Sequence, residues 1–380
     1  MIGRLGKSVS TLVTTAAIAS SLVAFLTIAP AFAKTTDEAQ KTLNIYNWSD
    51  YIAEDTIANF EKETGIKVHY DVFDSNEVLE AKLLSGKTGY DIVAPSADFL
   101  LHQIKAGVYQ PLDKKKLSNW KHLDGELMTL METYDPNNQF SFPYLWGTTG
   151  IGYNPDLVKE HLGKDAPINS WSLIFDEKNI SKLSQCGVAF LNAPTEVIPA
   201  ALSYLGLDPN STNRADYAKA EALLMKVRPY VTYFHSSRSI SDLANGDICV
   251  AMGWSGDVLQ AADRATEAGN GVTVEYVIPD EGAGLWFDTV AIPRDAKNPE
   301  EAHIFLNYLL RPDVIANITD YVAYANPNKS ATTLVDDDIR ENPGIYPTNE
   351  AKERLFVFEV LPSKINRQVN RMFTKLTSGQ

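Results

Sequence analysis

The sequence predicts an α/β protein of two lobes, each a mainly parallel sheet flanked by helices. Strand-like and helix-like segments alternate along most of the chain, the order that builds parallel sheets. The 380 residues less an N-terminal leader of 33 leave 347, more than one hydrophobic core usually covers. Residues 142–153 interrupt the alternation, so they are a candidate crossing between the lobes.

The leader, residues 1–33, has the layout of a signal peptide. Arg4 and Lys7 precede an uncharged stretch from Ser8 to Ala33, and the stretch ends in the small-x-small tripeptide Ala31-Phe32-Ala33. We therefore expect export and cleavage after Ala33. An uncleaved membrane anchor is the alternative, because the uncharged segment approaches the length of a bilayer span.

The first part of the chain reads as strand and helix in alternation. Apolar patterns predict strands at 42–48, 66–73 and 90–95. Helices are expected between and after them, around 52–64, 79–84 and 98–105. Gly65 and Gly86 stand where the first two helices would end. Residues 142–153 mix small residues with β-formers, which favours a strand that crosses between lobes and acts as a hinge.

The alternation resumes after this crossing. Strands are predicted at 187–191, 231–235, 248–252, 272–278 and 285–292. Helices are predicted at 197–205, 217–227, about 242–246 and through the region 299–321. This order predicts one lobe from residues 41–146 and 285–332, and a second lobe from 147–284 and 333–380.

The chain is acidic. Its formal net charge is −14 with 34 basic and 48 acidic residues, and removal of Arg4 and Lys7 gives 32 minus 48, or −16. Such a surface repels nucleic acid and anionic lipid, and its field favours cationic partners. Solubility alone is the alternative explanation of the charge.

Four predicted strand ends carry related side chains, and ligands of open α/β sheets bind at such ends. They are Trp48-Ser49-Asp50-Tyr51, Pro95-Ser96-Ala97-Asp98, Trp254-Ser255-Gly256-Asp257 and Trp286-Phe287-Asp288. Tryptophan faces attract an ammonium, and a carboxylate neutralises it. Each motif alone suits a helix cap or a core residue. Their recurrence favours a site for an organic cation.

None of the four clusters contains Arg or Lys, the residues that receive a ligand carboxylate. Arg238 and Arg294 are the nearest candidates, and both could be surface residues. A ligand that bears amines and no carboxylate fits this composition best.

Enzyme motifs are missing from the sequence. The six histidines are dispersed without metal-ligand spacing, and no nucleophile elbow, P-loop or dinucleotide fingerprint occurs. We expect no catalytic residue, no metal and no cofactor. The alternative is an exported glycoside hydrolase, in which two of the carboxylates act as acid and nucleophile while tryptophans stack on sugar.

Cys186 and Cys249 are the two cysteines of the chain. Export would place them in an oxidising compartment, which favours a disulfide. Two separately buried thiols are the alternative.

Longer motifs carry a family resemblance across essentially all of the chain after the leader. They are Asn47-Trp-Ser-Asp-Tyr51, Pro95-Ser-Ala-Asp-Phe99, Tyr233-Phe-His-Ser-Ser237, Asp242-Leu-Ala-Asn-Gly-Asp-Ile-Cys-Val250, Gly253-Trp-Ser-Gly-Asp-Val258 and Tyr324-Ala-Asn-Pro-Asn328. The chain resembles periplasmic polyamine-binding proteins of ABC importers, especially the putrescine-binding type. The resemblance implies the type II two-lobed periplasmic-binding-protein fold, closure on a polyamine without catalysis, a monomer, and delivery to a membrane-embedded ABC permease.

The resemblance also implies roles for individual residues. Trp48, Trp254, Trp286 and Tyr324 would line the methylene chain of the ligand; Asp50, Glu196, Asp257 and Asp288 would take its ammonium groups; Ser49, Tyr51, Ser96 and Ser236 would support them; Asp98 and Phe358 complete the set. The family commonly pairs cysteines placed like Cys186 and Cys249.

Two positions depart from the putrescine-binding pattern. Asp98 stands where a smaller neutral residue is expected, and Trp286 stands where Phe is usual. Tryptophan there is similar to the spermidine receptors, whereas Asp50 and Asp257 are similar to the putrescine receptors. The preference between putrescine and spermidine therefore stays open.

Overall fold

The structure is a computed structural model that describes residues 40–379. The predicted signal peptide and its cleavage after Ala33 lie outside the described residues. Within those residues, no helix combines the length and the apolar character needed to cross a membrane.

The first lobe begins with a β-α-β unit of parallel strands. Strand β1 (Thr42–Trp48) pairs in parallel with β2 (Lys67–Phe73) on one side and with β3 (Ile92–Val93) on the other. Helices α1 (Thr56–Thr64), α2 (Asn76–Ser85) and α3 (Ala97–Ala106) follow the three strands in turn. Helix α1 ends at Gly65, whose left-handed φ of 72° lets its N–H donate to Glu61.

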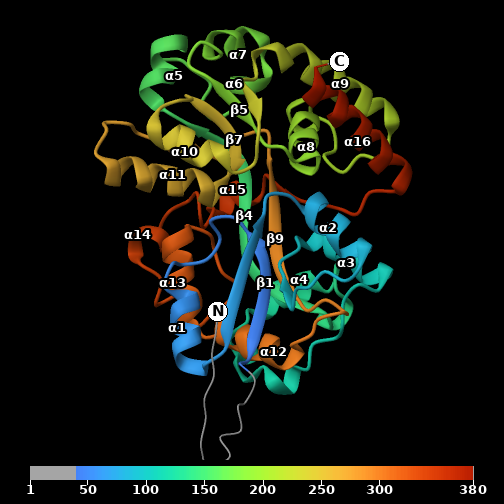
Figure 1. Cartoon of the computed structure of the whole chain (residues 1–380). Helices are drawn as coiled ribbons and strands as arrows, with labels where there is room; N and C mark the ends of the chain where they lie inside the picture. The colour runs from blue at the N-terminus through green and yellow to red at the C-terminus, as the bar shows by residue number, and fades with distance from the viewer. Residues whose placement is uncertain (1–39, 380) are drawn as a thin grey trace, which may run out of the picture. The chain divides into compact units, whose positions relative to one another are not determined.

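Two long antiparallel strands connect the lobes. Strands β4 (Ser141–Tyr153) and β9 (Ala283–Ala291) pair along the first sheet, and β4 then pairs with β7 (Val250–Trp254) of the second sheet. Figure 1 shows both strands running from one lobe into the other. The predicted crossing strand at 142–153 is confirmed.

The second lobe has its own sheet. Strand β5 (Val188–Phe190) pairs in parallel with β6 (Tyr233–Phe234) and β7 (Val250–Trp254), while β8 (Glu275–Val277) pairs with β4. Helices pack around these strands (Figure 1). Among them are α8 (Pro194–Tyr204), α9 (Arg214–Val227), α10 (Arg238–Asn245) and α11 (Ser255–Ala268).

The remaining elements complete the two lobes. They are α4 (Gly125–Met131), α5 (Pro155–Leu162), α6 (Ser172–Phe175), α7 (Glu177–Leu183), α12 (Pro299–Leu309), α13 (Pro312–Val322), α14 (Asp337–Arg340), α15 (Asn349–Lys352), β10 (Leu355–Val357) and α16 (Ser363–Ser378).

The structure adds detail to two expectations about these elements. The sheet is mixed, because β4 runs antiparallel to β7, β8 and β9 and carries much of the pairing.

The helical region 299–321 consists of two helices that break before Pro312. Proline lacks the N–H that a helix interior requires, and it disfavours helical backbone at the residue before it.

Each lobe has its own hydrophobic core. Phe60, Leu100 and Phe305 are buried in the first, and Trp171 and Phe190 in the second. Val335 and Phe358 lie beyond the expected lobe boundary at 332 but pack in the first core. We therefore propose that the second lobe takes up its last segment after Phe358, where Ile365 and Phe373 of α16 join the second core.

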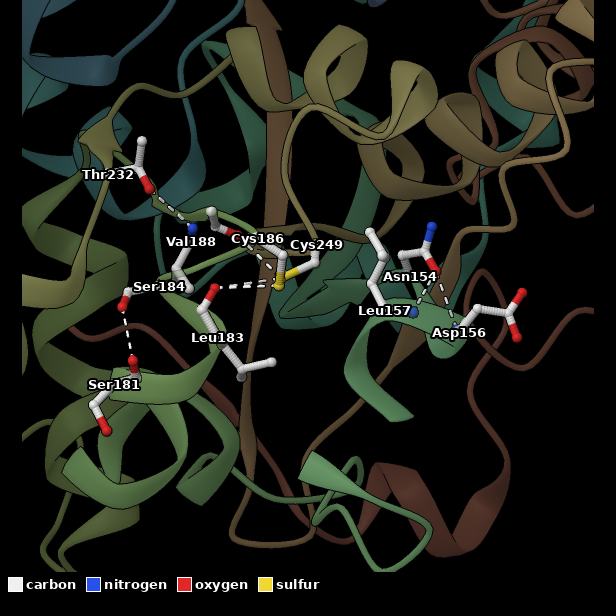
Figure 2. The surroundings of a disulfide bond; sticks show 11 residues. Asn154, Asp156, Leu157, Ser181, Leu183, Ser184, Cys186, Val188, Thr232 and Cys249 are labelled. Carbon is white, nitrogen blue, oxygen red and sulfur yellow. Dashed lines mark hydrogen bonds between the residues drawn. A yellow bond between two sulfur atoms is a disulfide. The ribbon is translucent and has the colours of Figure 1, made fainter. Parts of the chain in front are cut away.

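A disulfide ties the second sheet together. Cys186 and Cys249 are bonded, with their Cα atoms 5.5 Å apart in space and the residues 63 positions apart in sequence. Figure 2 shows the bond beside Leu183, whose carbonyl lies next to both sulfur atoms. On the chain-entropy account, closing a loop of this length stabilises a fold by roughly 4 kcal/mol.

Candidate functional site

A cavity opens between the two lobes, where strand ends and helix N-termini converge. Its walls come from the ends of β1, β2 and β7, the interior of β9, and the first turns of α8 and α11. The lining residues are Trp48, Ser49, Tyr51, Phe73, Asp74, Asn76, Ser96, Glu196, Ser236, Ser237, Trp254, Asp257, Trp286, Asp288 and Tyr324.

Aromatic rings form two sides of the cavity. Trp48 meets Trp254 edge-on with ring centroids 5.6 Å apart, and the indole N–H of Trp48 donates to the Ala94 carbonyl at 2.9 Å. Tyr324 meets Trp286 at 5.3 Å and Tyr51 at 5.1 Å. Because each ring is fixed by a neighbour, the walls are already in place for a slender ligand.

Asp288 lies in the interior of β9, whereas the sequence analysis placed it at a strand end. Its backbone forms a bridge with Ser96, the residue that follows β3 and precedes α3. The Ser96 hydroxyl donates to the Asp288 carboxylate, and Asn76 Nδ2 donates to the Ser96 oxygen at 2.9 Å. Burial raises the pKa of Asp288 to about 7, partly offset by the bond from Ser96.

Asp257 lies in the first turn of α11. The Tyr324 hydroxyl donates to its carboxylate at 2.6 Å, and the backbone N–H of Asp257 donates to the same hydroxyl oxygen at 3.1 Å. Burial raises the pKa of Asp257 to about 7, and the bond from Tyr324 opposes that rise. A helix N-terminus also favours negative charge there.

Glu196 supplies a third carboxyl group from the first turn of α8. The Thr149 hydroxyl of β4 donates to it at 2.6 Å. Burial raises the pKa of Glu196 to about 8, and the nearby charges of Asp98 and Asp288 add to the rise. All three carboxyl groups are therefore costly to ionise in this environment.

Within the part of the chain that the structure describes, these three carboxyl groups have no basic side chain as a direct partner. Among residues 40–379, no Lys or Arg forms an ion pair with Glu196, Asp257 or Asp288, and none lines the cavity. Across the same residues, the hydroxyl of Ser236 and the indole N–H of Trp286 are buried without a hydrogen-bond partner. The cavity therefore suits a ligand that brings positive charge and hydrogen bonds with it.

Asp50 is not among the residues that line the cavity. It sits in a turn after β1 with a left-handed φ of 52°, and its carboxylate accepts from Arg264 of α11 at 2.6 Å. This contact links the two lobes. The role implied for Asp50 toward a ligand ammonium stays a prediction.

Asp98 and Phe358 also lie outside the lining. Asp98, in the first turn of α3, borders a neighbouring cavity together with Glu77, Glu80 and Glu359. Burial raises the pKa of Asp98 to about 7, and the charges of Glu77 and Asp288 contribute. Phe358 lies against the backbone of Gly284 in β9, in a space that a Cβ at position 284 would fill.

Sequence reasoning missed Phe73, Asp74, Asn76 and Ser237, which also line the cavity. Phe73 is the last residue of β2, and Asp74 and Asn76 follow it, so the strand-end rule applied to the other clusters would have found them. Asp74 accepts from Ser49 at 2.8 Å and from Ser237 at 3.3 Å, which makes a second hydrogen-bonded link between the lobes.

Comparisons with known proteins agree on one family. A family model described as bacterial extracellular solute-binding protein matches residues 55–348. The chain is 61% identical to the putrescine-binding periplasmic protein PotF of Escherichia coli over 342 residues, covering 90% of this chain and 92% of that protein. It is 59% identical over 340 residues to the putrescine-binding periplasmic protein SpuD of Pseudomonas aeruginosa, with 90% and 93% covered.

Solved structures support the same assignment. The substrate-binding protein PotD of a spermidine/putrescine ABC transporter from Streptococcus pneumoniae superposes with a TM-score of 0.71 at 29% identity, covering 89% of this chain and 99% of that one. The predicted α/β fold of a type II periplasmic binding protein is confirmed. The chain belongs to the family of bacterial extracellular solute-binding proteins.

Proposed function

We propose that this chain is a periplasmic receptor that captures protonated polyamines, putrescine, spermidine or both, and delivers them to an ABC importer. The observation that carries the proposal is the set of three buried carboxyl groups, Glu196, Asp257 and Asp288, which lie among aromatic rings and have no ion-pair partner within residues 40–379. The relatives named above as putrescine-binding support it.

The chemistry of a polyamine matches the cavity in two respects. Its ammonium groups neutralise the carboxylates and attract the indole faces of Trp48, Trp254 and Trp286. Its methylene groups lie against the same rings and lose water on closure. A buried carboxylate without a partner is costly, so closure is favoured when the ligand supplies the missing charge.

Export and delivery complete the proposal. Removal of residues 1–33 would release the chain into the periplasm. The relatives PotF and SpuD are named as periplasmic proteins. There the receptor would act as a monomer and pass its ligand to a membrane-embedded permease, without nucleic acid as a partner. Binding without chemical change is the activity proposed, and catalysis by paired carboxylates receives no support from the relatives named.

Calorimetric titration of the ligand-stripped protein tests the proposal, with putrescine, cadaverine, spermidine and spermine as ligands. Ornithine is the matched control, since it is putrescine with a carboxylate, and no Arg or Lys lines the cavity to receive that group. We expect binding of at least one polyamine and none of ornithine. Absence of binding by all four polyamines would overturn the proposal, and turnover of chromogenic glycosides would support the hydrolase instead.

A further inference from the structure

One face of helix α11 contacts the first lobe at successive turns. Gly256, Gln260 and Arg264 are four residues apart, so they lie on the same side of the helix. Gln260 Nε2 donates to the Val322 carbonyl at 3.1 Å and to the Asp50 carbonyl at 3.3 Å, and Arg264 pairs with Asp50. This face of α11 is therefore a seam between the lobes.

Gly256 is the point of closest approach along this seam. A methyl group on its Cα would lie 2.5 Å from Tyr324 Cε2 and 2.6 Å from Tyr324 Cδ2, far inside van der Waals contact. The φ of Gly256 is not in the left-handed region, and a helix turn ordinarily favours alanine over glycine. The backbone conformation therefore does not require glycine at this position. The close approach of the Tyr324 ring does require it.

The Tyr324 ring cannot move aside to make room for a side chain at position 256. It is 1% exposed, and it packs against Tyr51 and Trp286 on its other sides. Its hydroxyl is also held by the carboxylate and the backbone N–H of Asp257. Any side chain at position 256 would therefore move the helix away from the ring.

We infer that Gly256 sets how closely the two lobes approach and is a positioning residue for closure on the ligand. This inference rests on the proposed function. A methyl group at 256 holds the first turn of α11 off Tyr324, so Asp257 loses its bond from the tyrosine and shifts from the cavity wall. The separated lobes have no such contact, so the same methyl group leaves the open, ligand-free form unstrained.

The test compares Gly256→Ala with Gly125→Ala in polyamine titrations, melting curves and small-angle X-ray scattering. Gly125 is a matched control because it begins helix α4, has no left-handed φ, and has open space around its Cα. We expect Gly256→Ala to weaken polyamine binding roughly tenfold or more and to reduce ligand-induced compaction. Its ligand-free melting temperature should match that of the unchanged protein, and Gly125→Ala should match it in every measurement.

The same substitution in a Tyr324→Ala chain distinguishes an effect on closure from a general loss of structure. In a Tyr324→Ala chain the ring that the methyl group meets is gone, so adding Gly256→Ala should have little further effect on affinity. Wild-type affinity in Gly256→Ala, an equal further loss in the Tyr324→Ala background, or a lowered ligand-free melting temperature would each overturn the inference. Failure of the unchanged protein to bind any polyamine would instead overturn the proposed function.

Discussion

Asp288 shows how a single carboxyl group can be prepared for a cation. It is 4% exposed and receives a hydrogen bond from Ser96, which Asn76 holds in place. These neutral donors steady the carboxylate without cancelling its charge, and burial holds its pKa near 7. A ligand ammonium would supply the charge that the protein withholds.

Replacing that carboxyl group with an amide should therefore remove a charge partner while keeping its shape. We expect Asp288→Asn to weaken polyamine binding by about 2 kcal/mol or more, roughly thirtyfold, because a buried ammonium is left without its partner. Calorimetry measures the loss. Asp156→Asn, an exposed change in the first turn of α5, is the control and should bind as the unchanged chain does. Unaltered affinity in Asp288→Asn would remove Asp288 from the site.

Residue types and spacing identified most of the lining but could not fix the direction of each side chain. Asp50 directly follows Trp48-Ser49, Asp257 follows Trp254-Ser255-Gly256, and neither local pattern tells the two carboxylates apart. Asp257 lies in the first turn of a helix and lines the cavity, whereas Asp50 occupies a left-handed turn and pairs with Arg264. That difference depends on a residue more than 200 positions away, which local pattern cannot reveal.

Helix α11 is the element that carries contacts between lobes along one face. The ion pair of Arg264 with Asp50 is partly open to solvent, since the two side chains are 39% and 35% exposed. Exposed ion pairs contribute little, typically less than about 1 kcal/mol, and salt screens them. The pair therefore adds only modestly to affinity, by slowing the reopening of the closed lobes.

We expect Arg264→Gln to raise the dissociation rate of a bound polyamine by roughly twofold to fivefold, with the association rate almost unchanged. Stopped-flow displacement measures both rates. Arg340→Gln, which removes an ion pair within helix α14, is the control. The difference between Arg264→Gln and the unchanged protein should shrink at high salt. An equal effect of the two substitutions would contradict this role for α11.

The elements themselves were largely predictable, because apolar periodicity and glycine caps are local. The strand ends at Trp48 and Trp254 fell where expected. The segment Trp286–Asp288 was harder, since it lies mid-strand and reaches the cavity only because β9 runs beside the end of β3. Antiparallel pairing of this kind is set by the whole sheet, so strand patterns alone suggested a mainly parallel arrangement.

At the scale of the whole molecule, the buried carboxyl groups couple closure to protons. Asp257 and Asp288 have pKa values near 7 and Glu196 near 8 in this conformation, raised chiefly by burial. A carboxyl group whose pKa is raised on folding binds more protons in the folded state. Its stabilising contribution is complete below about pH 4 and is lost as the pH rises through about 7 to 8. The ligand-free closed form should therefore become less stable as the pH rises through that window.

Polyamine binding should show the opposite dependence on pH. An ammonium stabilises ionised carboxylates, so binding near pH 7 must release protons from Glu196, Asp257 and Asp288. We expect affinity to rise from pH 5 to pH 8. Near pH 7, the heat of titration should differ between buffers of different ionisation enthalpy, because the buffer takes up the protons that binding releases. The size of the difference gives the number of protons released. Asp288→Asn should release fewer protons than the unchanged protein, because it has one fewer carboxyl group. Affinity that stays constant from pH 5 to pH 8, with no buffer dependence of the heat, would mean that these groups are already ionised before the ligand arrives.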